Sequence, residues 1–205
     1  MIEFYAGNTP NNQRVAIMLE ELALPYRLHK VDVFAGGTKT PEFLRLNPDA
    51  LSPVIIDPEG PGNKSVTLTQ SWLICLYLAD KAKRFIPADE LGRLRVLEVL
   101  FHVATDVAMV HTTHNTLSRF VPEKVPSTIA FYEQRVLAAL QTLDHRLQSA
   151  EYLAGDLSVA DLAFYPIFNR RRAMVEGRPD YANLERWGRV MDARAACKRG
   201  LAVTE

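Results

Sequence analysis

The sequence contains only two cysteines in 205 residues, Cys75 and Cys197, and they form no CxxC motif. Such sparse and widely separated thiols do not make a disulfide framework. Cytosolic proteins keep their thiols reduced, whereas small secreted domains use closely spaced cysteines as cross-links. The cysteine content therefore favours a cytoplasmic location.

The sequence also lacks an excess of either charge and lacks a long hydrophobic run. Lys and Arg together number 24, as do Asp and Glu, so the formal net charge is zero, whereas nucleic-acid-binding proteins usually carry a basic excess or face. The longest apolar stretch, residues 72–79, is far below the roughly 18 residues that a spanning helix needs. The N-terminus has neither the basic region nor the long apolar core of a secretion signal. We expect no nucleic-acid partner, no membrane partner and no secretion signal.

What is present is a globular composition, 48% hydrophobic and 23% charged, sufficient for one or two domains with a core. The first part of the chain alternates between strand and helix patterns. Strands are predicted at 2–5, 26–33, 54–56 and 66–68, and helices at 12–22, 41–46 and 71–82. The first two strands and the helix between them form a βαβ unit, which predicts parallel pairing. The last two strands flank a Pro- and Gly-rich loop and predict an antiparallel hairpin.

From Glu90 onward the sequence shows helical spacing and no strand pattern. One apolar face continues from Leu91 to Val110, and further helices are predicted at 124–147, 159–172 and 181–197. The chain therefore divides into an α/β domain at 1–82, a linker at 83–88 and an all-helical domain at 89–205.

Polar residues crowd the turn between the first strand and the first helix, where Thr9, Pro10, Asn11 and Asn12 follow one another. Thr9 before Pro10 is typical of a helix N-cap with proline at the first helical position. The same side chains could instead donate hydrogen bonds to a bound group. The turn alone favours capping.

Three later segments can also be interpreted locally. Pro53 precedes a strand, and X–Pro bonds are cis in only about 5–6% of cases, so the sequence alone predicts a trans bond after Ser52. Gln70 and Ser71 begin a helix, where Ser71 could be an N-cap or, with the helix N-terminus, a carboxylate site. Ser158 and Asp161 have the spacing of a capping box and no chemical role is assigned to them.

In their order and spacing these segments resemble those of a cytosolic glutathione transferase. The resemblance rests on the βαβ-ββα beginning, the Asn-Pro and Pro-Val pairs at 47–54, the helix start at 70–78 and the YLAGD box at 152–161. The stretches TPN, PEFLRLNP and RFVPEKVP look most like the bacterial nu class. The resemblance covers nearly the whole chain. It implies a thioredoxin-like α/β N-terminal domain, an all-α C-terminal domain, glutathione as co-substrate and a homodimer.

The resemblance also implies roles for individual residues. Pro53 would be cis, and the backbone of Ser52 would pair with the cysteinyl part of glutathione. Gln70 and Ser71 would hold the γ-glutamyl carboxylate. Thr9 and Asn11 would lie nearest the sulfur. Thr38, or its neighbour Lys39, would lie at the glycine end, where relatives carry an amide side chain.

A thiolate site of this kind does not need a strong base. A free thiol has a pKa near 8.5, and lowering it by about two units requires about 2.7 kcal/mol. One hydrogen bond to a charged group supplies about 1.5–3 kcal/mol, and a helix N-terminus adds about 0.3–1 kcal/mol. We therefore interpret Thr9, Asn11 and Asn12 as donors aimed at a bound sulfur. Tyr5, the rival activator, lies inside the first strand and is interpreted as packing, and Cys75 as a core residue.

The second substrate is expected between the domains, beside His111, His114, Asn115 and Phe120, although the two histidines could instead cap or solvate a helix end. Too few ligands are present for a metal site. The run 169–172 is interpreted as a solvated helix end.

The predicted enzyme is a glutathione S-transferase whose thiolate attacks an electrophile, a peroxide or a disulfide, with disulfide reduction and peroxide reduction favoured. The alternative is a module of the same fold that binds without turnover. The apolar residues Val99, Phe101 and Val103 leave room for a dimer contact.

Overall fold

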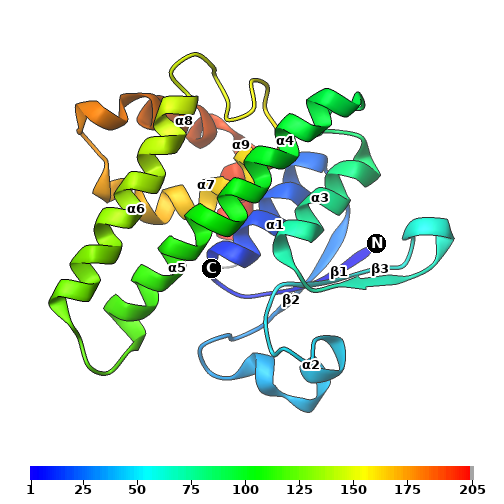
Figure 1. Ribbon diagram of the computed structural model, residues 1–205. Helices are drawn as coiled ribbons and strands as arrows, with labels where there is room; N and C mark the ends of the chain where they lie inside the picture. Colours follow the sequence, from blue (N-terminus) through cyan, green and yellow to red (C-terminus); the bar gives the residue numbers. More distant parts are fainter. Residues whose placement is uncertain (204–205) are drawn as a thin grey trace. The chain divides into compact units, whose positions relative to one another are not determined.

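The computed structural model describes residues 1–203 and contains a four-stranded mixed sheet with the order β2-β1-β3-β4 (Figure 1). The strands are β1 (Ile2–Ala6), β2 (Tyr26–Lys30), β3 (Val54–Asp57) and β4 (Val66–Leu68). β1 and β2 are parallel, whereas β1–β3 and β3–β4 are antiparallel. The predicted βαβ unit and hairpin are both confirmed.

The second strand is shorter than its sequence pattern indicates: it ends at Lys30 and not at residue 33. Its partner β1 ends at Ala6, which pairs with Lys30. At Gly7 the backbone lies so close to the Val31 carbonyl that a β-carbon would be 2.3 Å from its oxygen. Only glycine fits at this position, directly after the last ladder pair.

Three helices accompany the sheet: α1 (Pro10–Leu22), α2 (Pro41–Leu46) and α3 (Ser71–Ala82). α1 and α3 lie against one face and α2 lies on the other (Figure 1). Alternate residues of β1, namely Ile2, Phe4 and Ala6, are buried, as expected for a strand with one covered face. Short 3₁₀ turns at Gly37–Lys39 and Pro61–Asn63 complete the connections.

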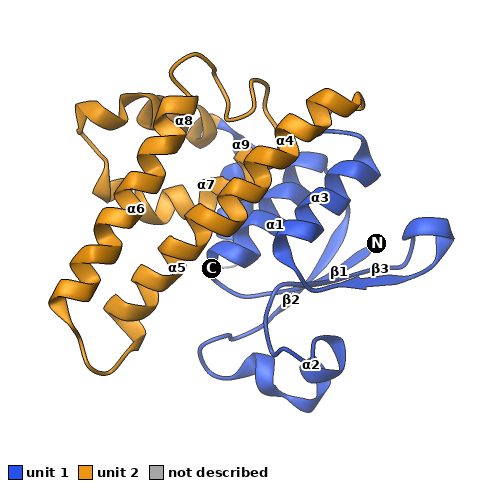
Figure 2. Cartoon of the chain, viewed as in Figure 1, with its two compact units in different colours: residues 1–86, 194–205 blue, residues 87–193 orange. Residues whose placement is uncertain are grey.

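A second compact unit, residues 87–193, is helical (Figure 2). It contains α4 (Glu90–His102), α5 (Ala108–Asn115), α6 (Pro126–Arg146), α7 (Val159–Arg171) and α8 (Ala182–Ala193). The helical face predicted up to Val110 is interrupted by a π-helical turn at Val103–Val107, and a second one follows α5 at Thr116–Phe120. No helix in residues 1–203 is long and apolar enough to cross a membrane.

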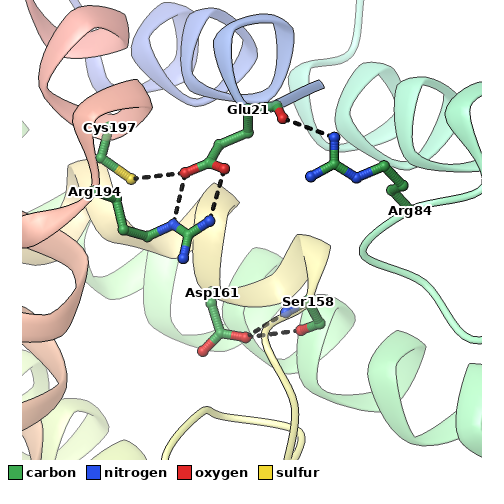
Figure 3. Close-up of polar contacts among 6 residues, drawn as sticks. All are labelled: Glu21, Arg84, Ser158, Asp161, Arg194 and Cys197. Carbon is green, nitrogen blue, oxygen red and sulfur yellow. Dashed lines mark hydrogen bonds and ion pairs between the residues drawn. The ribbon is translucent and has the colours of Figure 1, made fainter. Parts of the chain in front are cut away.

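The capping box of α7 is confirmed, and its aspartate organises the core of this unit. Asp161 accepts from the Ser158 hydroxyl at 2.8 Å and from the Ser158 backbone at 3.0 Å (Figure 3). The same carboxylate accepts from the Leu153 N–H and the Trp187 indole, each at 2.9 Å. Asp161 is a folding element, as its spacing predicts.

The end of the chain returns to the first unit, so residues 1–86 and 194–205 form one compact unit (Figure 2). The sequence-based division placed 194–205 with the helical domain, and it predicted one helix at 181–197. Instead, α8 and α9 (Ala195–Ala202) are separate helices with an extended residue, Arg194, between them. The break has a tertiary cause: Arg194 donates to both carboxylate oxygens of Glu21 on α1, at 2.6 and 2.8 Å (Figure 3).

Helix α9 approaches α1 closely at Gly200. A β-carbon at this position would lie 2.6 Å from the Cα and N atoms of Ile17. Arg84 also reaches α1, donating to the Glu21 carbonyl at 3.2 Å (Figure 3). The C-terminal helix is thus a structural part of the unit that carries the opening turn.

Replacing Gly200 with alanine is expected to destabilise the protein by about 1–3 kcal/mol, because the new methyl group would meet backbone atoms. The sign of the change in unfolding free energy distinguishes the two effects, since alanine in a helix interior is otherwise favoured over glycine by up to about 1 kcal/mol. Urea unfolding measures the change. The exposed Lys198→Ala on the same helix should stay within about 0.5 kcal/mol of the wild type. A Gly200→Ala protein as stable as the wild type would contradict the close contact.

Candidate functional site

The turn between β1 and α1 begins with a capping threonine. The Thr9 Oγ1 accepts from the backbone N–H of Asn12 at 3.4 Å and from the Asn12 side-chain amide at 2.6 Å, and Pro10 is the first helical residue. The capping interpretation is therefore confirmed. A hydroxyl has two acceptor lone pairs and one hydrogen. Because both lone pairs of Thr9 are occupied, its hydrogen remains available to donate elsewhere.

Asn12 supports this turn from within and does not face a ligand. It is fully buried, and its Nδ2 donates to the Thr9 Oγ1 at 2.6 Å and to the Ser52 Oγ at 3.0 Å. Its Oδ1 is buried and accepts no hydrogen bond from the described residues. The prediction that Asn12 donates to a bound sulfur is wrong, because both of its amide hydrogens are used inside the protein. Sequence position alone could not reveal this, since Ser52 is 40 residues away.

The segment before β3 contains a cis peptide bond between Ser52 and Pro53. The trans bond expected from the local sequence is wrong, and the cis bond implied by the family resemblance is confirmed. The loop is held by Asn47, whose Nδ2 donates to the Leu51 carbonyl at 2.7 Å. Ser52 therefore lies beside the opening turn, joined to it through Asn12.

Ser71 is the first residue inside α3, and the residue at the N-cap position is Gln70, whose side chain makes no capping hydrogen bond. The simple N-cap interpretation of Ser71 is therefore wrong. Ser71 is buried and Gln70 is exposed. The N–H groups of the first helical turn have no acceptor within the helix. Together with the Ser71 hydroxyl they make a site suited to a carboxylate.

Arg14 connects these two helix starts and was not identified from the sequence. It is fully buried, and its guanidinium NH1 donates to the Asn11 Oδ1 at 2.6 Å and to the Ser71 Oγ at 2.8 Å. The guanidinium carbon also lies 3.8 Å from the centre of the Trp72 ring. Burial lowers the pKa of Arg14 to about 10, so the group is positive at neutral pH. Arginine is rarely fully buried, so nothing in the sequence indicated that Arg14 lies in the core. Its i, i+3 spacing from Asn11 was the only sign that the two side chains could meet.

Thr38 and Lys39 lie on the 3₁₀ turn Gly37–Lys39, which leads into α2. Thr38 is buried and Lys39 is exposed. A pocket of about 430 Å³ next to this turn is lined by Tyr5, His29 and residues of α2. The Tyr5 ring stacks on His29 with the centroids 4.3 Å apart, so Tyr5 packs as predicted.

The two cysteines are not available as nucleophiles. Both are buried and neither forms a disulfide. Burial raises the pKa of the Cys75 thiol to about 12, and the Cys197 thiol lies 3.9 Å from the Glu21 carboxylate (Figure 3). The residues that the structure describes contain no group of three or more metal-ligating side chains.

The residues predicted to contact a second substrate lie in the helical unit. His111 accepts from the Arg171 Nε at 2.8 Å through its Nδ1, and its carbonyl accepts from the same guanidinium at 3.1 Å. His114 is buried, and its Nδ1 has no partner among the described residues. Burial and then the nearby charge of Arg171 lower the pKa of His114, which keeps it neutral. Phe120 is exposed.

The interpretation of residues 169–172 as a solvated helix end is wrong for two of its arginines. Arg171 is half-buried and bound to His111. Arg172 pairs with Asp192 through contacts of 2.6 and 2.7 Å. Both partners lie far away in the sequence, at distances of 60 and 20 residues, so no local pattern could indicate them.

Comparison with known proteins places these features in a family. A model of the glutathione S-transferase N-terminal domain matches residues 9–81, and one of the glutathione S-transferase C-terminal domain matches residues 108–194. The disulfide-bond oxidoreductase YfcG of Escherichia coli is 31% identical, with 98% of this chain and 94% of that protein aligned.

Solved structures show the same similarity. A glutathione transferase family member from Pseudomonas fluorescens with two glutathione bound superposes with a TM-score of 0.90 at 29% identity, covering 98% of this chain and 92% of that one. A glutathione transferase from Pseudomonas putida with one glutathione disulfide bound per subunit gives 0.91 at 27% identity, covering 100% and 92%. Its domain matches and its nearly full-length relatives show that this chain belongs to the glutathione S-transferase family.

Proposed function

We propose that this protein is a glutathione-dependent transferase of the nu type, acting as a disulfide-bond reductase or peroxidase. The observation that carries the proposal is the grouping of donors in one unit. Thr9 and Asn11 lie at the opening turn, and a hydrogen bond from Asn12 joins Ser52 to that turn. Ser71 lies at the start of α3 and is joined to Asn11 through Arg14. In this proposal, Thr9 and Asn11 would face the sulfur, Ser52 the cysteinyl backbone, and Ser71 the γ-glutamyl carboxylate of glutathione.

The chemistry needs no sulfur from the protein. The thiolate of one bound glutathione attacks one sulfur of a disulfide substrate, forms a mixed disulfide and releases the other half as a thiolate. A second glutathione thiolate then attacks the mixed disulfide, which releases the remaining substrate thiolate and forms glutathione disulfide. The relatives support this route, since one is named a disulfide-bond oxidoreductase and another was solved with glutathione disulfide.

The roles of the individual residues are proposals of the same kind. Thr9 and Asn11 would donate to the thiolate, Ser52 and Pro53 would fix the cysteinyl part, and Gln70 and Ser71 would hold the γ-glutamyl group. Thr38 and Lys39 would face the glycine end, and the exposed ammonium of Lys39 suits a carboxylate. His111, His114 and Phe120 would contact the second substrate, with His114 neutral.

We also propose a homodimer and a cytoplasmic location. The sequence-based dimer contact needs correction, because Val99 and Val103 are buried inside the helical unit. Phe101 is exposed, as are Leu91 and Leu94 on the same helix, and exposed apolar side chains that cluster on one helix support an interface. Sedimentation equilibrium tests the dimer. The buried, unbridged cysteines support a reducing compartment.

Binding to a glutathione-affinity column, followed by disulfide-reduction and peroxide-reduction assays with glutathione, tests the function. We expect retention on the column and turnover in at least one assay. Retention without turnover on any electrophile, peroxide or disulfide would instead indicate a binding module. Failure to bind glutathione would contradict the enzyme proposal.

The two ends of the site should respond differently to mutation. Ser71→Ala is expected to weaken glutathione binding by about 1–3 kcal/mol because a charged group loses a hydrogen bond, which is roughly 5–150-fold in Kd. Thr9→Ala and Asn11→Ala should each raise the pKa of the bound thiol by about 1–2 units.

Isothermal titration measures the affinity, and ultraviolet titration of the bound thiolate measures the pKa. The exposed Ser65→Ala on the same unit is the control and should change neither quantity. An unchanged thiol pKa in both opening-turn variants would show that these side chains are not the thiolate donors.

The cysteines should be dispensable. We expect iodoacetamide to leave Cys75 and Cys197 of the native protein unmodified, because both are buried and only a thiolate reacts readily. Intact-mass spectrometry should show no adduct on the native protein and two after denaturation. Cys75→Ala and Cys197→Ala should keep glutathione-dependent turnover. Loss of turnover in a variant that still folds would assign a chemical role to that cysteine.

A further inference from the structure

Arg14 contacts two residues of the proposed glutathione site, Asn11 and Ser71. Its guanidinium donates 2.6 Å to the Asn11 Oδ1 and 2.8 Å to the Ser71 Oγ. These two acceptors belong to different helices, α1 and α3, and lie on the parts of the site assigned to the thiol and to the γ-glutamyl carboxylate. Arg14 itself is fully buried, so it acts through these side chains and not on the ligand.

A guanidinium can only donate hydrogen bonds, since it carries N–H groups and no lone pair. Whatever atom it contacts must therefore be an acceptor. For Asn11 this fixes the amide with its oxygen toward Arg14 and its NH2 group away from it. For Ser71 it excludes the hydroxyl hydrogen from the side that faces Arg14. The Asn11 NH2 group is thereby turned away from Arg14, and the Ser71 hydroxyl hydrogen is left for a partner other than Arg14.

We propose that Arg14 is a positioning residue that sets the hydrogen-bond direction of Asn11 and Ser71 together, so that both present donors to an anionic ligand. This inference rests on the proposed function. It adds a residue that binds no ligand atom and yet controls thiol acidity and carboxylate affinity at once. Without Arg14, the Asn11 amide could turn its oxygen outward and repel a thiolate.

The position of Arg14 is fixed on a third side. Its guanidinium carbon lies 3.8 Å from the Trp72 ring centre, on the residue after Ser71. A cation over an indole face is attracted to it, and a planar guanidinium can also stack there. The nearby Cys75 thiol is neutral, so it does not cancel the charge. The positive charge thus faces the site through Asn11 and Ser71 and favours anions there.

The test compares Arg14→Met, which removes the charge and the donors, with Arg14→Lys, which keeps a donor-only cation. With Arg14→Met we expect the Kd for glutathione to rise roughly 10–150-fold, the effect of losing hydrogen bonds to a charged group, and the thiol pKa to rise by about one unit or more. Arg14→Lys should recover most of the thiol acidity. Arg27→Met, an arginine of the same unit whose side chain is 62% exposed, should change neither value.

A double-mutant cycle distinguishes this role from a merely structural one. If Arg14 acts on the thiol through Asn11, then Arg14→Met should raise the thiol pKa less in an Asn11→Ala background than in the wild type. Equal shifts in both backgrounds would overturn the proposed route through Asn11. Thermal unfolding of each variant shows which of them fold.

The wild-type protein provides a second measurement that does not depend on the folding of any variant. In ¹⁵N spectra, the side-chain NH2 signals of Asn11 should shift when glutathione binds, since they face the ligand, while those of the buried Asn12 should stay nearly unchanged. An Asn11 signal that does not move on a glutathione-saturated protein overturns the inference and the proposed donor role of Asn11, and it leaves glutathione-dependent activity itself intact. Wild-type protein that does not bind glutathione overturns both.

Discussion

The site depends on the burial of one guanidinium, that of Arg14. Removing a cation from water costs several kcal/mol unless hydrogen bonds and favourable contacts replace its hydration. Asn11, Ser71 and Trp72 provide such contacts from the starts of α1 and α3. The requirement to satisfy this charge therefore holds the two helix starts together. In our proposal, the buried positive charge of Arg14 favours an anion at these two helix starts.

Asn12 is a second buried donor that joins separate segments of the site, and it carries no charge. Its amide donates to Thr9 and Ser52 and so joins the opening turn to the segment with the cis proline. Each hydroxyl that accepts from Asn12 keeps its own hydrogen for another partner. The polar groups of the opening turn thus form two layers. Buried Asn12 and Arg14 donate to Thr9, Asn11 and Ser71, and in the proposed function these three residues would donate to the ligand.

Local patterns predicted the elements whose causes are local. Thr9 before Pro10 marked the start of α1, β-branched runs marked the hairpin, and Ser158 with Asp161 marked the start of α7. The two helix starts depend on residues within about four positions of one another, where the rules of capping hold, and the hairpin joins two strands that are neighbours in the sequence. The parallel pairing of β1 and β2 followed from chain connectivity alone.

The features that the residues alone did not predict have partners far away in the chain. Arg14 meets Ser71 across 57 residues, and Arg194 meets Glu21 across 173. Arg194 breaks a helix without a glycine or proline, so no local stop signal exists there. The cis bond at Pro53 was also against the local expectation. Only the resemblance to a family, which carries tertiary information, supplied it.

The environment of Cys75 supports the proposal that the reactive thiol belongs to a ligand. Arg14 lies near the Cys75 thiol and acts to lower its pKa, yet burial dominates and raises that pKa to about 12. Desolvation penalises the thiolate more than one neighbouring charge can stabilise it. In the proposed function, a ligand thiol at the opening turn would meet donors from Thr9 and Asn11 without entering the core. It can therefore gain from the same guanidinium without losing as much hydration. In the proposed function, a buried positive charge behind accessible donors would acidify the thiol of a bound ligand, while burial leaves the protein's own Cys75 protonated.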